Sequence, residues 1–449
     1  MHLLTKYPIV SIVIGLVLIE IVELVALTVS APLGIACRVI GTMMVVCSLF
    51  FTKHYPFKTT PLPYQLFIYW SVIVILRGSL IGNFKPGENP SLFNIINGLM
   101  TGGSAFAYLL PLVAILCYDM KMLSYLKKTS FIFSFVSLLL IVLMKDYFMS
   151  ASFYLGDSGF SDTFGGTMTS RAFVTMLFPG FGLITFMAFT YEYIDDKIKF
   201  LLPLAILAYF FGEAIAAGRA QSVLSLGYLV SILYLSYKYG LNKTQTYKKT
   251  SGRKKKMVIV IVVCLFLSFI IYLYNTTEVF DLLMQRAFGG KGESSFAGSG
   301  REALSDAMIK DFNNNPIDWI VGRGINGSYI YNEYVEGESI GRRIYMEWGF
   351  LYMILKGGIV YLFLSTIILL RAVFLGLKRS NNLLCKAMAV MCFWQIIGLS
   401  CGISEPFMNA RIAVVWMCVG CIENRKIRQL DDNTIRTYFN NRVQSKAIK

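Results

Sequence analysis

The chain has 449 residues, of which 56% are hydrophobic and only 15% are charged, and its mean hydropathy is +0.60. This composition leaves no room for a separate soluble domain and indicates a polytopic membrane protein. The net charge is +16, but eight Lys and Arg residues lie within 238–256 and seven within 425–449. Basic clusters beside apolar runs are what the positive-inside rule expects of cytoplasmic loops. We therefore expect membrane lipids, and no nucleic acid, among the partners.

Apolar runs of about 20 residues, enough to cross a bilayer, recur along nearly the whole chain. They lie near residues 8–29, 32–52, 64–84, 94–117, 129–149, 170–190, 199–217, 220–237, 256–274, 350–375, 383–402 and 407–423. The pattern predicts an all-α bundle of about twelve transmembrane helices. Its expected parts are helices in 1–274, a long outward loop with short helices in 275–349, helices in 350–424 and a basic cytoplasmic tail in 425–449. We expect the first run to be a retained span, since no small-residue cleavage site follows it.

The outward loop contains the polar stretch 299–329, around which we expect the chain to be organised. Ser299 and Glu302 have the spacing of a capping box, which predicts a short amphipathic helix that starts at Ser299. The apolar residues that repeat on one face of this helix are Leu304, Ala307, Met308 and Phe312. Arg301 lies in its first turn, and the helix should end within 313–316. Beyond it, Arg323 lies between two glycines, which let the backbone approach a ligand while the arginine offers its planar fork to a phosphate.

Arginine is unusually frequent on the face that we expect to point outward. The residues concerned are Arg77, Arg171, Arg219, Arg286, Arg301, Arg323, Arg342 and Arg343. A positive-inside protein should have few of these, so each needs an explanation. Ordinary explanations exist: Arg77 snorkels outward, Arg219 and Arg323 are solvated turn residues, and Arg342 and Arg343 pair with nearby glutamates at helical spacing.

Histidine takes no part in chemistry on the outer face, because the only histidines, His2 and His54, are placed on the cytoplasmic side. This excludes an HExxH zinc site and a Ser-His pair there. The chain also has no Walker A sequence. We therefore expect no metal and no cofactor, and a substrate that arrives already activated.

An ordered set of motifs resembles the O-antigen ligase and Wzy O-antigen polymerase superfamily. The motifs are AAGRA at 216–220, Gly300-Arg301, VGRGING at 321–327, and WGF at 348–350 followed by Gly357-Gly358. The resemblance covers about 216–370. It implies a metal-independent glycosyltransferase of the polytopic GT-C type in a bacterial inner membrane, working in lipopolysaccharide biosynthesis. The implied donor is a glycan on a polyprenyl (undecaprenyl) diphosphate at the periplasmic face, and a chain-length regulator protein is an implied partner.

The diphosphate suits the outer arginines, because a guanidinium binds such an anion in bidentate fashion and stabilises it as a leaving group. We expect Arg219, Arg301 and Arg323 to bind it, followed by Arg286 and Arg342. The expected reaction is polymerisation of lipid-linked repeat units into O-antigen or capsular polysaccharide. The alternatives are a ligase that joins finished polymer to the lipid A core and a flippase or transporter that does no chemistry.

One departure from the superfamily favours a polymerase. Its ligases typically carry a histidine in the outer loop, near the span that follows, whereas this chain has none after His54. Carboxylates are then the simplest general bases. Glu338 and Glu405 are expected to serve, ahead of Glu347 and Asp306.

Overall fold

The computed structural model describes part of the chain. The described residues are 8–21, 25, 30–50, 60–80, 105–116, 123, 132, 227–228, 230–231, 234–235, 295–331, 334–335, 338–339, 341–343, 346, 348–400 and 410–435. The spans expected near 129–149, 170–190, 199–217, 220–237 and 256–274 therefore lie wholly or largely outside the described residues. The chain divides into two compact units, the first formed by 1–118, 291–372 and 392–420 and the second by the remainder.

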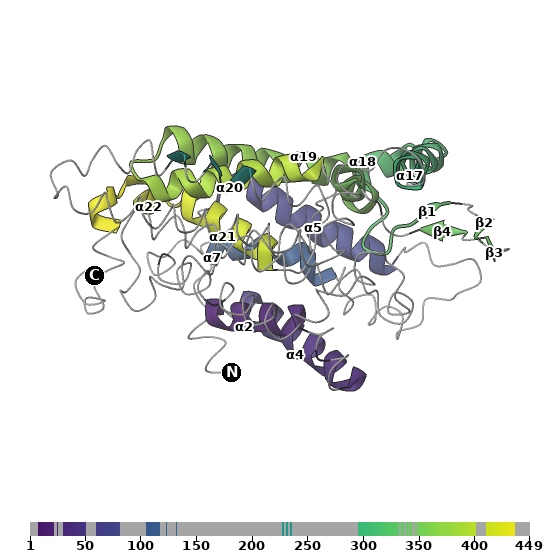
Figure 1. The fold of residues 1–449 in the computed structure, drawn as a ribbon, viewed down its shortest axis with the longest axis horizontal. Coiled ribbons are helices and arrows are strands. Elements are labelled where there is room, and N and C mark those ends of the chain that lie inside the picture. The colour runs from purple at the N-terminus through teal and green to yellow at the C-terminus, as the bar shows by residue number, and fades with distance from the viewer. Residues whose placement is uncertain are drawn as a thin grey trace, which may run out of the picture. The chain divides into compact units, whose positions relative to one another are not determined.

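The described residues are mostly helical, which confirms the all-α class for this part of the chain (Figure 1). The helices are α2 (Pro8–Glu20), α4 (Ala31–Phe50), α5 (Leu62–Leu80), the 3-10 helix η2 (Ala105–Leu109), α7 (Leu112–Leu116), α17 (Ser295–Asn313), α18 (Ile317–Val321), α19 (Gly349–Lys378), α20 (Leu383–Leu399), α21 (Ala410–Glu423) and α22 (Arg425–Gln429). Helices α4, α5, α19, α20 and α21 lie where apolar spans are expected. The span expected at 94–117 differs, because its described part breaks into η2 and α7 at Pro111, which has no N–H to continue a helix.

Two of the described helices are long and apolar enough to cross a membrane, judged by length and composition. They cover Pro32–Phe50 and Gly349–Lys378. Shorter apolar helices run over Pro8–Ile19, Leu62–Gly78 and Leu383–Leu399. The described structure thus gives limited support for a membrane protein, and the count of about twelve spans remains a prediction.

The core of the first unit is built around aromatic rings from helices far apart in sequence. The ring of Phe67 in α5 lies 4.8 Å from that of Tyr361 in α19 and 5.6 Å from that of Trp416 in α21. Tyr108 in η2 contacts Tyr361 edge to face at 5.6 Å. All four side chains are fully buried. These rings bury large apolar areas and so fix α5 beside α19 and α21.

The polar stretch folds onto the first turns of α19. Leu304, Met308 and Phe312 are buried and pack with Leu351 and Leu355 of α19 in one apolar cluster. The predicted apolar face of α17 is thereby confirmed. Its predicted start is wrong, because the helix begins at Ser295 instead of Ser299.

Two short strand pairs follow α18 and were not expected from the sequence. Strand β1 (Tyr329–Ile330) pairs antiparallel with β4 (Arg342–Arg343), and β2 (Tyr334–Val335) pairs with β3 (Glu338–Ser339). Aromatic and β-branched residues in β1 and β2 favour extended backbone. Because Arg342 and Arg343 lie in a strand, the helical spacing proposed for their pairing with glutamates does not apply.

In the second unit, a buried asparagine joins two of the described helices. The side-chain amide of Asn382, just before α20, donates to the carbonyls of Ile427 at 2.9 Å and Leu430 at 3.1 Å. Its oxygen accepts the backbone N–H of Cys385 at 2.8 Å, which caps α20. Asn382 thereby ties the start of α20 to α22.

Candidate functional site

The loop that follows α18 is wedged against a break in α19. At the break, Gly358 leaves the helical conformation with φ +72° and ψ −179°, so the carbonyls of the preceding turn lose their partners within the helix. The carbonyl oxygens of Leu355 and Lys356 accept the backbone N–H groups of Arg323 and Gly324, each at 2.8 Å. The arginine-containing loop therefore supplies the hydrogen bonds that the broken helix lacks.

Further hydrogen bonds join the loop after α18, the break in α19 and helix α5. The carbonyl of Gly357 accepts the indole N–H of Trp70 from α5 at 2.8 Å. In return, the buried ammonium group of Lys356 donates to the carbonyls of Ile325 at 3.1 Å and Gly327 at 2.8 Å. Buried polar backbone groups are tolerated only where they are satisfied in this way.

Glycines allow the loop after α18 to lie close to the backbone of neighbouring helices. Gly324 has φ +79°, and a Cβ on it would overlap the backbone of Gly78 in α5. A Cβ on Gly358 would overlap the carbonyl of Ile320 in α18. The side chain of Asn326 also donates to the carbonyl of Gly78 at 3.2 Å. The backbone that these glycines approach is that of neighbouring helices, whereas the sequence had led us to expect a ligand.

Arg323 is buried, and its guanidinium N–H groups donate hydrogen bonds to other groups of the protein. Its Nε donates to Asp318 at 2.7 Å, and one terminal nitrogen donates to Asp311 at 2.5 Å and to the carbonyl of Ser328 at 2.7 Å. The guanidinium also lies over the ring of Phe312, 4.5 Å from its centre. Burial disfavours the charge, but the hydrogen bonds to both carboxylates and their negative charges outweigh it and raise the pKa of Arg323.

Asp318 joins this network to α5. While one of its oxygens accepts Arg323, the other accepts a terminal nitrogen of Arg77 at 2.8 Å. Asp311 in turn accepts the backbone N–H of Ile330 in β1 at 3.0 Å. Two arginines and two carboxylates balance each other, as buried charges require. Arg77, for which snorkelling was one explanation, pairs with Asp318 instead.

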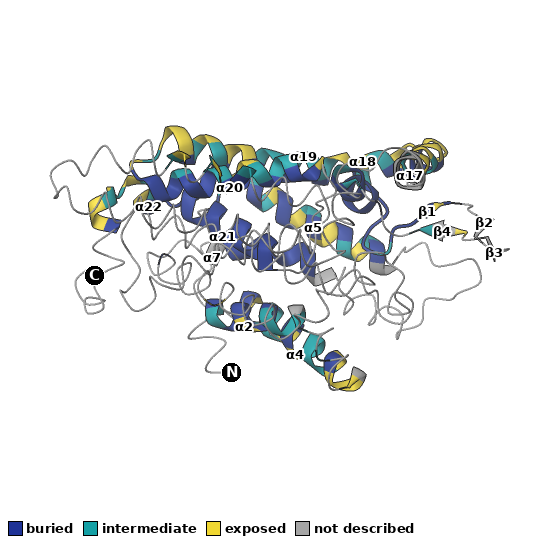
Figure 2. Ribbon diagram, in the orientation of Figure 1, coloured by how far each residue is buried: buried dark blue, intermediate teal, exposed yellow. Residues whose placement is uncertain are grey.

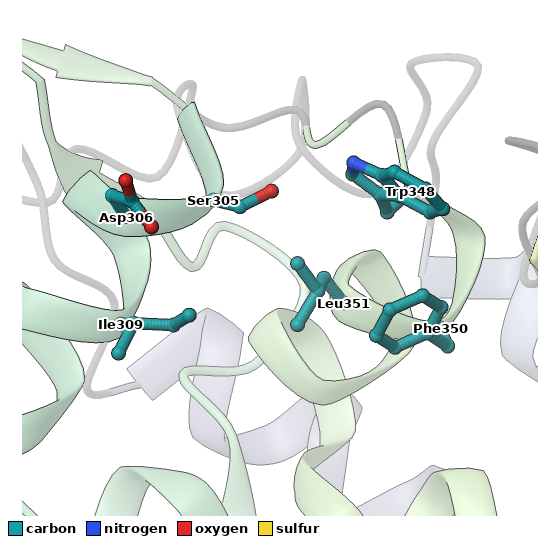
Figure 3. A pocket seen from close by; sticks show the side chains of 6 residues that line it. All are labelled: Ser305, Asp306, Ile309, Trp348, Phe350 and Leu351. Carbon is teal, nitrogen blue, oxygen red and sulfur yellow. The ribbon is translucent and has the colours of Figure 1, made fainter. Parts of the chain in front are cut away.

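A cavity of about 450 Å³ opens between α17 and the start of α19 (Figure 3). Its lining residues are Ser305, Asp306, Ile309, Trp348, Phe350 and Leu351. In Figure 3 the hydroxyl of Ser305 points across the cavity toward Trp348, and the ring nitrogen of Trp348 lies on the side that faces it. The volume falls within the range of about 300–1,000 Å³ that is typical of small-molecule sites.

For the other predicted site residues the structure gives the position in an element or no description. Arg301 lies in α17, one helical turn before Ser305, which puts both positions on one face. Arg342 lies in β4 and Glu338 in β3, in two different strand pairs. Arg219, Arg286 and Glu405 lie outside the described residues. Among the predicted arginines that the structure describes, only Arg301 is carried by a helix that lines the cavity, and the candidate base Asp306 of the same helix lines the cavity itself.

Sequence reasoning missed Asp311, Asp318 and Lys356. The two aspartates precede Arg323 at separations that match neither a helix nor a strand, so only the folded chain brings them to it. Lys356 carried a usable signal, because an ionisable residue inside an apolar run is rare and requires polar partners.

Comparisons of the chain with protein-family models, with curated protein sequences and with solved structures found no match. Its function is therefore inferred from its residues and their geometry.

Proposed function

We propose that this chain is a polysaccharide polymerase of about twelve membrane spans, with the segment that contains α17 and α18 on the periplasmic side of a bacterial inner membrane. Its donor is a glycan linked to a polyprenyl diphosphate, and its acceptor is a hydroxyl group of the next lipid-linked repeat unit. In the reaction the anomeric C–O bond to the diphosphate breaks while the bond to the acceptor oxygen forms. The acceptor proton passes to a carboxylate, for which Glu338 and Glu405 are proposed.

The observation that carries the proposal is the position of the arginine-bearing polar segment. The apolar face of α17 packs on the first turns of α19, the longest apolar helix among the described residues. The loop after α18 donates hydrogen bonds to the carbonyl groups at the break in the same helix. A polar segment at the end of an apolar helix suits a substrate that has an anionic head and an apolar tail, because it can bind the head while the tail lies beside the helix.

Exposed apolar faces on two helices support a location in the membrane. In α5 such residues are Leu62, Leu66, Tyr69, Ile73 and Leu76, and in α19 they are Ile359, Phe363, Leu370, Phe374 and Leu377 (Figure 2). Their spacing places each set on one side of its helix. Large exposed apolar faces mark contact with lipid or with other protein segments, and a polytopic membrane protein needs both.

We propose Arg301 as the first donor-binding arginine, because its position in α17 is one turn from a residue of the cavity. The further arginines proposed to bind the diphosphate are Arg219, Arg286 and Arg342. Arg323 also belonged to this predicted group. Since Asp311 and Asp318 occupy its donors, we now assign it the role of holding the segment in place.

Reconstitution with purified lipid-linked repeat units tests the proposal. The wild-type protein should produce a ladder of lengthening glycans on a gel, and Arg301→Ala should produce none while it accumulates normally in membranes. Lys310→Ala, which removes an exposed cation of the same helix, is the matched control and should leave the ladder intact. Product formed only when lipid A core is supplied would identify a ligase instead. Translocation without any new glycosidic bond would identify a transporter.

A further inference from the structure

We propose that the cavity between α17 and α19 binds a saccharide, namely the sugar end of the lipid-linked acceptor. The choice of a saccharide rests on the proposed function. That the cavity is a ligand site rests on its lining, on the unpaired indole N–H of Trp348 and on its position.

The lining combines an aromatic wall with polar groups. Trp348 and Phe350 meet edge to face with their ring centres 5.7 Å apart, and Leu351 of α19 and Ile309 of α17 add further apolar lining. The polar groups come from three side chains, which are the carboxylate of Asp306, the hydroxyl of Ser305 and the indole N–H of Trp348 (Figure 3). A sugar ring has apolar C–H faces and a rim of hydroxyl groups that both donate and accept hydrogen bonds. Aromatic residues with a polar edge, together with a carboxylate, suit both features.

The indole N–H of Trp348 is left free where comparable groups are paired. Trp70 donates its N–H to the carbonyl of Gly357 at 2.8 Å, and Trp319 donates to the side chain of Asn313 at 3.2 Å. Among the residues that the structure describes, the N–H of half-buried Trp348 has no hydrogen-bond partner, and the carboxylate of Asp306 is exposed at the cavity. Because the indole N–H is a strong donor that tryptophan usually pairs where it is buried, the unpaired group of Trp348 offers a donor to a ligand in the cavity.

The position of the cavity suits the substrate. Trp348 immediately precedes α19, and aromatic residues at the end of an apolar helix are typical of the interface between membrane and water. The sugars of an acceptor whose lipid tail lies in the bilayer start at this level. The polar face of α17 that carries Ser305 also carries Arg301 one turn away, so donor diphosphate and acceptor sugar would meet at one helix.

Calorimetric titration of the purified full-length protein tests the inference. The probe is the repeat-unit oligosaccharide released by mild acid from lipid-linked intermediates of the producing strain, free of lipid and diphosphate. Asp306→Ala and Trp348→Ala should each weaken binding about tenfold to a hundredfold, and Ser305→Trp should block the cavity and abolish binding. The matched controls are Lys310→Ala, on the same helix outside the lining, and Trp394→Phe, and both should bind as the wild type does.

Two results would overturn the inference: no binding of the probe by the wild-type protein, or binding that is unchanged in all three cavity variants. In the second case Trp348 would be an interfacial residue only. If Trp348→Ala fails to fold, as judged by its thermal midpoint, Asp306→Ala and Ser305→Trp decide the question, since both positions lie on the surface side of α17. A wild-type protein that binds the probe but forms no polymer would refute the polymerase and leave the saccharide site standing. A wild-type protein that forms polymer while its cavity variants bind normally would refute the saccharide site alone.

Discussion

Removing the guanidinium of Arg323 should destabilise the fold before it affects any ligand. Arg323→Met keeps much of the side-chain volume but leaves Asp311 and Asp318, whose side chains are only 10% and 5% exposed, without their shared cation. Breaking a buried ion pair by removing one partner costs about 3–5 kcal/mol, because an uncompensated charge stays buried. At about 2 °C per kcal/mol, the value for the larger single domains, the thermal midpoint should fall by about 6 °C or more.

The assay is thermal unfolding of the detergent-purified protein, followed by the fluorescence of a thiol-reactive dye on its buried cysteines. Arg77→Met is the internal comparison. Its side chain is 24% exposed and it meets only one of the two carboxylates, so its loss should cost about 1 kcal/mol or less. The double variant Arg323→Met/Asp311→Leu replaces charge by apolar groups and should recover part of the loss. An unchanged midpoint for Arg323→Met, together with loss of polymer, would refute the structural role and restore the predicted role in binding diphosphate.

Other substitutions test separate parts of the proposal. Gly324→Ala places a Cβ against α5 at a positive φ, so the protein should accumulate in membranes at a small fraction of the wild-type level on an immunoblot. Arg301→Lys should lower polymer formation by about tenfold or more, because a point charge does not replace a bidentate fork, and normal synthesis would rule out that contact. Glu338→Gln should slow turnover about a hundredfold if the carboxylate is the general base; an unaltered rate in initial-velocity measurements excludes it. In spheroplasts, a cysteine introduced by Lys310→Cys should react with a membrane-impermeant thiol reagent and one introduced by Lys378→Cys, at the far end of α19, should not, and the opposite labelling would reverse the topology.

Periodicity in the sequence was sufficient to predict the apolar face of α17, since Leu304, Met308 and Phe312 are all buried. The start of that helix was not predictable from a local capping signal, because the chain is already helical at Ser295 and helix ends depend on context. The apolar runs likewise predicted the positions of α4, α5 and α19. A helix that is buried or contacts lipid must be mostly apolar, and a long run of apolar residues is visible directly in the sequence.

The environment of Arg323 could not be predicted in the same way. The sequence shows an arginine between glycines, which is compatible with a ligand site and with a packed loop. The choice depends on Asp311, Asp318 and the carbonyls of α19, which reach Arg323 only through the fold. The cavity beside Asp306 was equally hidden, because its two walls come from α17 and from the start of α19.

The break in α19 also bears on how the protein is assembled during synthesis. The loop that serves the carbonyls of Leu355 and Lys356 is translated before α19 itself. In the proposed membrane location a carbonyl without a partner costs several kcal/mol, so we expect α19 alone to insert as an uninterrupted helix. The break at Gly358 would then form only when the loop after α18 binds to α19. The conformation of α19 would thus depend on a segment that is synthesised before it. A chain whose loop cannot dock should accordingly reach the membrane with α19 inserted but unbroken, and quality-control proteases should remove it from there.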